Sequence, residues 1–114
     1  MSCEAKAKGT LQFESKEVLD ELFGDLDPED EAAAEVLEAI EGQVTRDGAT
    51  LRLSIHGSFT ADGNLEFQTW LEDLAEAATQ GHIDTWQEDF GDSMYVRLIA
   101  GEEDEQEMPG PFPA

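Results

Sequence analysis

A run of closely spaced acids, Asp25, Asp27, Glu29 and Glu31, contains the carboxylates that a calcium site requires. An EF-hand loop also needs a glycine at its sharp turn and a bidentate glutamate at its end. Pro28 occupies the middle of this run, and neither the glycine nor the final glutamate stands at the required spacing. The sequence therefore predicts no specific metal site, and no motif in it requires a cofactor.

His56 lies two residues from both Ser54 and Ser58, and a histidine beside a serine is the pair that activates a hydroxyl nucleophile. These residues share one face if the segment is a strand. No acid stands at a spacing that would orient the imidazole, and Gly91 and Gly101 are isolated rather than part of a phosphate-binding loop. We therefore expect no enzymatic activity and interpret His56 as a half-exposed strand residue.

The main chemical feature of the chain is its charge. Its 28 acidic residues oppose six basic ones, which gives a formal net charge of −22. Self-repulsion of this size works against the compact state. It also opposes direct binding to nucleic acid or to an anionic membrane, because both are negatively charged. A basic protein surface is the complementary partner.

The acids are concentrated in two segments that contain no lysine or arginine. Residues 17–41 contain eleven acids, and residues 62–92 contain nine. The six basic residues are Lys6, Lys8, Lys16, Arg46, Arg52 and Arg97. Because the basic residues fall in the N-terminal stretch or in predicted strands, we expect an anionic helical layer and a sheet that carries the positive charge.

Within the two longer predicted helices, the acids recur at helical spacing and form rows on the outward side. Neighbours in such a row are about 5–6 Å apart, and each like-charged pair costs about 0.2–0.5 kcal/mol in an isolated helix. A sequence selected for stability alone would mix lysine into these rows. We therefore predict a partner-binding surface on the helices. Its residues are Glu31, Glu35, Glu38, Glu66, Glu72, Asp73 and Glu76.

The segment 49–59 is the clearest structural element in the sequence. Leu51, Leu53 and Ile55 alternate with polar residues, which is the pattern of a half-buried strand. The dipeptide Asp47-Gly48 precedes it and favours a tight hairpin turn. The sequence therefore predicts a hairpin whose first strand spans about 43–46.

The remaining elements follow from capping residues and apolar periodicity. Ser15 and Asp27 are predicted to cap helices, and Gly24 and Gly81 to end them. The predicted helices span 15–24, 27–41 and 65–80, with a polar turn at 60–64. Further strands are predicted at 9–14, 82–90 and 94–99, and residues 1–6 are expected to be frayed.

The order β-α-α-β-β-α-β-β predicts an α+β fold. The economical arrangement is a mainly antiparallel sheet of four or five strands with two long helices and a short one on one face. Residues 1–100 are expected to form one domain, and the acidic, proline-rich residues 101–114 a disordered tail. The predicted core consists of Phe13, Leu53, Ile55, Trp70, Leu71, Leu74, Val96 and Leu98.

The face of the sheet away from the helices is expected to carry Arg52, His56, Tyr95 and Arg97. Single-strand RNA is bound on open sheet faces of this kind, but the net charge opposes that partner. A polar solvent face is one alternative. A contact between the sheets of a homodimer is the other.

The expected location is the cytoplasm. Cys3 is the only cysteine, so no internal disulfide can form, and a lone thiol fits a reducing compartment. No apolar run approaches the length of a membrane span, and residues 1–6 lack the apolar core of a signal peptide.

These features predict a non-enzymatic inhibitor that mimics nucleic acid and occupies the basic nucleic-acid-binding cleft of a target protein, as phage inhibitors of restriction or CRISPR effectors do. One alternative is an immunity protein that neutralises a cognate toxin such as a nuclease. A further alternative is an acidic structural or interaction domain adapted to high salt. Such a domain is expected to be acidic on every face, whereas Arg52 and Arg97 lie on predicted strands.

Salt is expected to stabilise the isolated protein, because screening weakens the repulsion among its carboxylates. The melting temperature, followed by circular dichroism, should rise as NaCl is raised from low to physiological concentration. A melting temperature that falls over this range would contradict the expectation.

Overall fold

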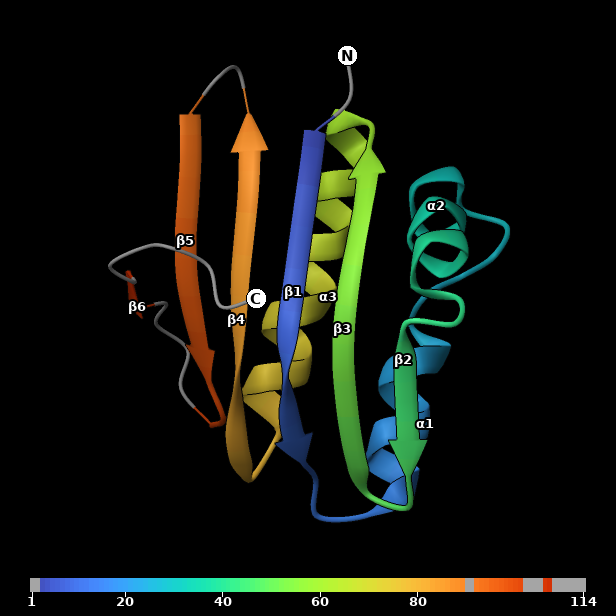
Figure 1. Ribbon diagram of the computed structural model, residues 1–114. Coiled ribbons are helices and arrows are strands. Elements are labelled where there is room, and N and C mark those ends of the chain that lie inside the picture. Colours follow the sequence, from blue (N-terminus) through green and yellow to red (C-terminus); the bar gives the residue numbers. More distant parts are fainter. Residues whose placement is uncertain (1–2, 90–91, 102–105, 108–114) are drawn as a thin grey trace.

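The protein consists of one antiparallel sheet with three helices packed on one of its faces, as a computed structural model describes it for residues 3–89, 92–101 and 106–107 (Figure 1). The elements in chain order are β1 (Cys3–Gln12), α1 (Lys16–Gly24), α2 (Glu31–Ile40), β2 (Val44–Asp47), β3 (Thr50–Phe59), α3 (Ala61–Ala77), β4 (Gln80–Asp89), β5 (Asp92–Ile99) and the two-residue β6 (Gln106–Glu107). The predicted α+β class and the predicted order up to β5 are confirmed.

The strands are arranged in the order β2-β3-β1-β4-β5-β6, and each neighbouring pair is antiparallel. The first strand of the chain is therefore central, with β3 on one side and β4 on the other. In Figure 1 the strands pass in front of α3, so the view looks onto the face of the sheet that the helices leave open.

The hairpin β2-β3 forms as its residue pattern predicts. Leu51, Leu53 and Ile55 are buried, while the residues between them are exposed. Asp47 pairs with Thr50, so the loop consists of Gly48 and Ala49. Gly48 has φ +60°, the left-handed conformation that a two-residue hairpin loop requires at its first position.

The expectation that residues 1–6 are frayed is wrong for the described part of that segment, because β1 begins at Cys3. The inward-facing residues of β1 before Leu11 are Ala5, Ala7 and Gly9, and both alanines are buried. Small residues give no large apolar signal in a sequence. They suit a central strand that lies beneath a helix, because they leave room for the helix's large side chains.

The helix α1 begins after Ser15 as predicted, with the Ser15 hydroxyl accepting a hydrogen bond from Val18 N at 3.3 Å. The helix α2 begins later than predicted, at Glu31. Asp30 caps it, and Asp27 instead accepts a hydrogen bond from Glu29 N at 2.9 Å within the preceding turn. The segment contains two aspartates able to cap a helix, and the one nearer the apolar stripe caps α2.

The helix α3 begins at Ala61 and ends at Ala77, rather than spanning 65–80. The Thr60 hydroxyl accepts a hydrogen bond from Gly63 N at 3.1 Å, so the predicted polar turn is the first turn of the helix. Gly81 lies in β4 with φ +104° and does not end the helix. A Cβ added to Gly81 would lie 2.1 Å from the Thr10 carbonyl oxygen, so the close approach of β4 to β1 requires glycine.

All eight predicted core residues are buried between the sheet and the helices. Aromatic contacts hold the helices to the sheet and to one another. Phe59 of β3 stacks on Phe67 of α3 with ring centroids 4.8 Å apart. Trp70 of α3 meets Phe23 of α1 edge-on at 5.3 Å and donates a hydrogen bond to the Leu22 carbonyl oxygen at 3.3 Å.

The strand β6 falls within the predicted tail 101–114. Its two residues pair with Val96 and Arg97 on the outer edge of β5. Residues 102–105 and 108–114 lie outside the described residues, so the expected disorder of the tail stays a prediction.

Replacing Leu53 with alanine should destabilise the protein by about 2–5 kcal/mol, because the side chain is only 3% exposed and its loss leaves a cavity. Urea denaturation of the variant measures this loss. Ser54→Ala, one residue away on the exposed face, is the control and should change the free energy of unfolding by less than about 0.5 kcal/mol. Equal effects of the two substitutions would show that the faces of β3 are assigned wrongly.

Candidate acidic interface

The structure places most of the basic residues on the face of the sheet opposite the acidic helices. Strand register places four of the six basic residues on the open face of the sheet, and these are Lys6, Lys8, Arg52 and Arg97. Lys16 lies in α1, and Arg46 forms an ion pair with Asp20 of α1 at 3.0 Å. The helices α2 and α3 contain no basic residue, and they pack against each other.

Most of the predicted partner-binding acids are exposed on these two helices. Glu31 and Glu38 of α2 are exposed, and so are Glu72, Asp73 and Glu76 of α3. Because α2 and α3 are neighbours, the fold places the two acidic rows on one layer of the molecule (Figure 1). We call these five exposed acids the acidic layer.

Glu66 and Glu35, the two remaining predicted residues, are half-buried. Glu35 does not point outward as its spacing predicts. Its carboxylate accepts hydrogen bonds from Thr60 N at 2.6 Å and from the Thr60 hydroxyl at 2.8 Å. It also lies against Gly63, where an added Cβ would be 2.2 Å from Glu35 Oε2. Glu35 therefore joins α2 to the first turn of α3 and has a structural role.

Two further features of this side of the molecule were not identified from the sequence. Leu65 on the outward side of α3 is 68% exposed, and among the described residues it is the one large hydrophobic side chain that is exposed. Its place outside the apolar stripe of α3 is the signal that identifies it. The second feature is the exposure of the acids between α1 and α2, which belong to the acidic segment 17–41 noted above. They extend the negative charge beyond the helices.

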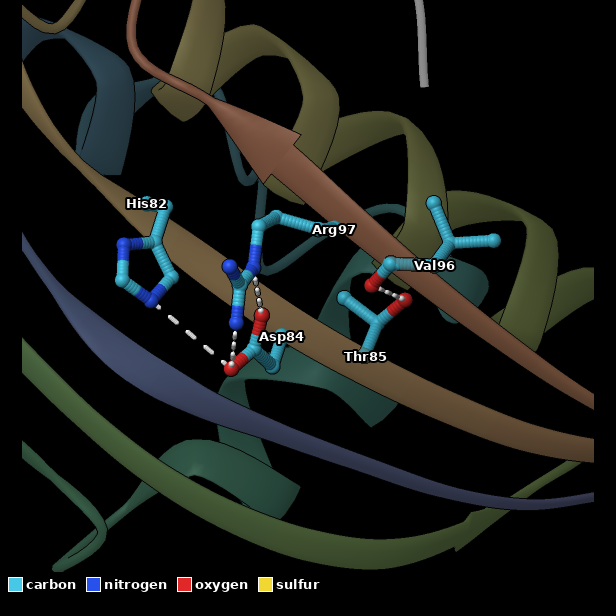
Figure 2. Close-up of polar contacts among 5 residues, drawn as sticks. All are labelled: His82, Asp84, Thr85, Val96 and Arg97. Carbon is cyan, nitrogen blue, oxygen red and sulfur yellow. Dashed lines mark hydrogen bonds and ion pairs between the residues drawn. The ribbon is translucent and has the colours of Figure 1, made fainter. Parts of the chain in front are cut away.

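The open face of the sheet holds a different kind of site, in which charges are paired. Arg97 of β5 reaches Asp84 of β4 with two hydrogen bonds of 2.7 and 3.3 Å (Figure 2). The side chain of Asp84 is only 8% exposed, and His82 Nε2 lies 3.7 Å from it. The hydrogen bond to Asp84, together with the negative charge of that carboxylate, raises the pKa of the Arg97 guanidinium.

A shallow hollow of about 480 Å³ lies between β1 and β4 beside this pair. Lys8, Thr10, Gln80 and His82 contribute to its lining. Among residues 3–89, 92–101 and 106–107, no group of three or more histidine, cysteine, aspartate or glutamate residues is arranged to hold a metal ion. No helix in that part of the chain is long and apolar enough to cross a membrane.

Comparison of the chain with protein-family models, with curated proteins and with solved structures finds no match. The functional argument therefore rests on the arrangement of the residues themselves.

Replacing Glu35 with alanine should destabilise the protein by about 1–3 kcal/mol, because Thr60 N and the Thr60 hydroxyl lose a charged acceptor at the start of α3. Chemical denaturation measures the change. Glu38→Ala removes the same charge one turn along α2 and is the matched control, with an expected change of less than about 0.5 kcal/mol. If both variants behave alike, Glu35 does not join the two helices.

Proposed function

We propose that this protein is a non-enzymatic inhibitor that binds the basic, nucleic-acid-binding surface of a target protein through its acidic layer. The partner is a nucleic-acid-binding protein or a nuclease, as for phage inhibitors of restriction or CRISPR effectors. One observation carries the proposal: α2 and α3 carry exposed acids without any base, while four of the six bases lie on the opposite face.

The chemistry of the contact follows from this separation. Lysine and arginine side chains that neutralise phosphates in a protein–nucleic acid complex would meet carboxylates instead, and such charge-assisted contacts are strong. The acids of the layer are mounted on helices, whose rigid backbone holds them at fixed spacing. The layer therefore presents an ordered array of negative charge without the entropy cost of ordering a flexible tail.

Adaptation to high salt accounts less well for the arrangement. It predicts an excess of acids on every face, whereas the open face carries basic side chains that include Arg52 and the Asp84–Arg97 pair. The second candidate function is an immunity protein directed against a cognate toxin. The exposed Leu65 supports it, because an apolar side chain within an acidic surface suits a pocket on a protein better than a channel for phosphates.

Reversal of four acids of the layer tests the proposal. In the layer variant Glu31, Glu38, Asp73 and Glu76 are replaced by lysine; Glu35 is left unchanged because of its structural role. The control replaces Glu14, Glu17, Glu21 and Asp25, which are exposed residues outside α2 and α3, and changes the net charge by the same amount. Circular dichroism establishes that both variants are folded.

The binding assay uses the immobilised protein and the fraction of a host lysate that heparin retains. We expect the native protein and the control to capture proteins that are released by competing DNA and by rising salt. The layer variant should capture none of them. Equal capture by the layer variant and the native protein would contradict the proposal. Loss of capture by the layer variant without displacement by DNA would favour the immunity function.

A further inference from the structure

On the open face of the sheet, the charges of the described side chains nearly balance. Its four bases, Lys6, Lys8, Arg52 and Arg97, stand against three acids among the described side chains. Those acids are Glu4, Asp47 and Asp84. Since the whole chain has a net charge of −22, the remaining surface carries almost all of the excess negative charge.

Because the open face is nearly neutral and the helical side is strongly negative, two copies can approach each other more easily through their open faces. Contact between two helical layers would bring the exposed acids of α2 and α3 together, and these helices contain no basic residue. Contact between two open faces leaves the acidic layers on opposite outer surfaces, separated by the two sheets of a molecule that measures 39 × 35 × 23 Å. That separation exceeds the Debye length of about 8 Å at physiological ionic strength, so the layers repel only weakly.

The centre of the face contains aromatic side chains. Trp86 of β4 and Tyr95 of β5 pair across the two strands with ring centroids 6.5 Å apart, and both are half-buried. Lys6 of the central strand β1 holds its Nζ 5.0 Å from the centroid of the Trp86 ring. Aromatic residues are enriched in the cores of protein interfaces, where a few of them contribute most of the binding energy.

The area of the face matches what a stable dimer needs. The strands β1, β3 and β4 are each ten residues long and lie in a sheet together with β2 and β5. With strands about 4.8 Å apart and a rise of about 3.4 Å per residue, the face covers roughly 700 Å². A stable interface buries about 800 Å² on each partner.

We propose that two copies of this chain associate through their open sheet faces, around a two-fold axis close to Trp86. A two-fold axis makes the contact reciprocal: where a base of one copy meets an acid of the other, the same acid of the first copy meets the same base of the second. Bases and acids of the face can therefore pair across the axis. The dimer presents an acidic layer on each outer surface. This inference does not depend on the proposed function, since it concerns the opposite face.

Sedimentation equilibrium of the full chain tests the association. We expect the mass of a dimer, and a dimer that becomes tighter as NaCl is raised to physiological concentration, because screening weakens the net repulsion between the copies. Binding to a basic partner weakens with salt, so the two kinds of association respond in opposite directions. A native protein that remains monomeric at every protein and salt concentration overturns the proposal.

Three variants that each shift the net charge by one positive unit locate the contact. Trp86→Lys removes the aromatic anchor, and Ser54→Lys adds a charge at an exposed position on the same face. Both are expected to weaken dimerisation at least about tenfold. Glu76→Gln, on the acidic layer, should leave it unchanged or slightly tighter.

Circular dichroism establishes whether Trp86→Lys folds. If it does not, Ser54→Lys still tests the same face, because Ser54 is exposed and its replacement should not disturb the fold. Dimerisation that survives the substitutions on the sheet face overturns the proposal. So does dimerisation that Glu76→Gln weakens as strongly, since the acidic layer would then be the contact.

Discussion

The structure depends on the pairing of β1 with both β3 and β4, because this pairing makes the first strand of the chain the centre of the sheet. The inward face of β1 is built from alanine and glycine before Leu11, so the bulk of the core comes from α3 and from the neighbouring strands. Phe67, Trp70 and Leu74 of α3 fill the space above the sheet. Once α3 lies there, the helices α1 and α2 pack beside it on the same face.

Because the helices pack on one face of the sheet, charged side chains can be exposed on two surfaces. The helices present a solvated outer surface, and the sheet presents its open face on the other side. The two surfaces differ: the charged residues of α2 and α3 are all acids, while the open face bears paired charges such as Asp84 and Arg97. The carboxylate of Asp84, of which only 8% is exposed, accepts hydrogen bonds from two nitrogens of the Arg97 guanidinium.

The sequence predicts what local patterns determine. The alternation in β3, the glycine of the hairpin loop and the cap at Ser15 all depend on residues within a few positions, and they are correct in the structure. Such local patterns do not predict contacts between segments that are distant in the sequence. The strand order and the inclusion of Cys3–Lys6 in β1 each depend on a partner far along the chain. Glu35 shows the same limit for the candidate site, since Thr60, which holds it, lies 25 residues away.

Some acids have a structural role in the fold, and they can be compared with the acids of the acidic layer. Glu35 joins two helices, Asp30 caps α2, and Asp84 binds Arg97, so the fold accounts for each of them. The acidic layer is different, because Asp73 and Glu76 of α3 stand one turn apart, and a like-charged pair at this spacing costs a few tenths of a kcal/mol. Replacing one acid of such a pair with lysine would turn that cost into a gain of similar size. A chain whose charged residues on two adjacent helices are all acids, and whose few bases lie elsewhere, retains an arrangement that stability alone does not explain, and the binding to a basic partner that we propose would account for it.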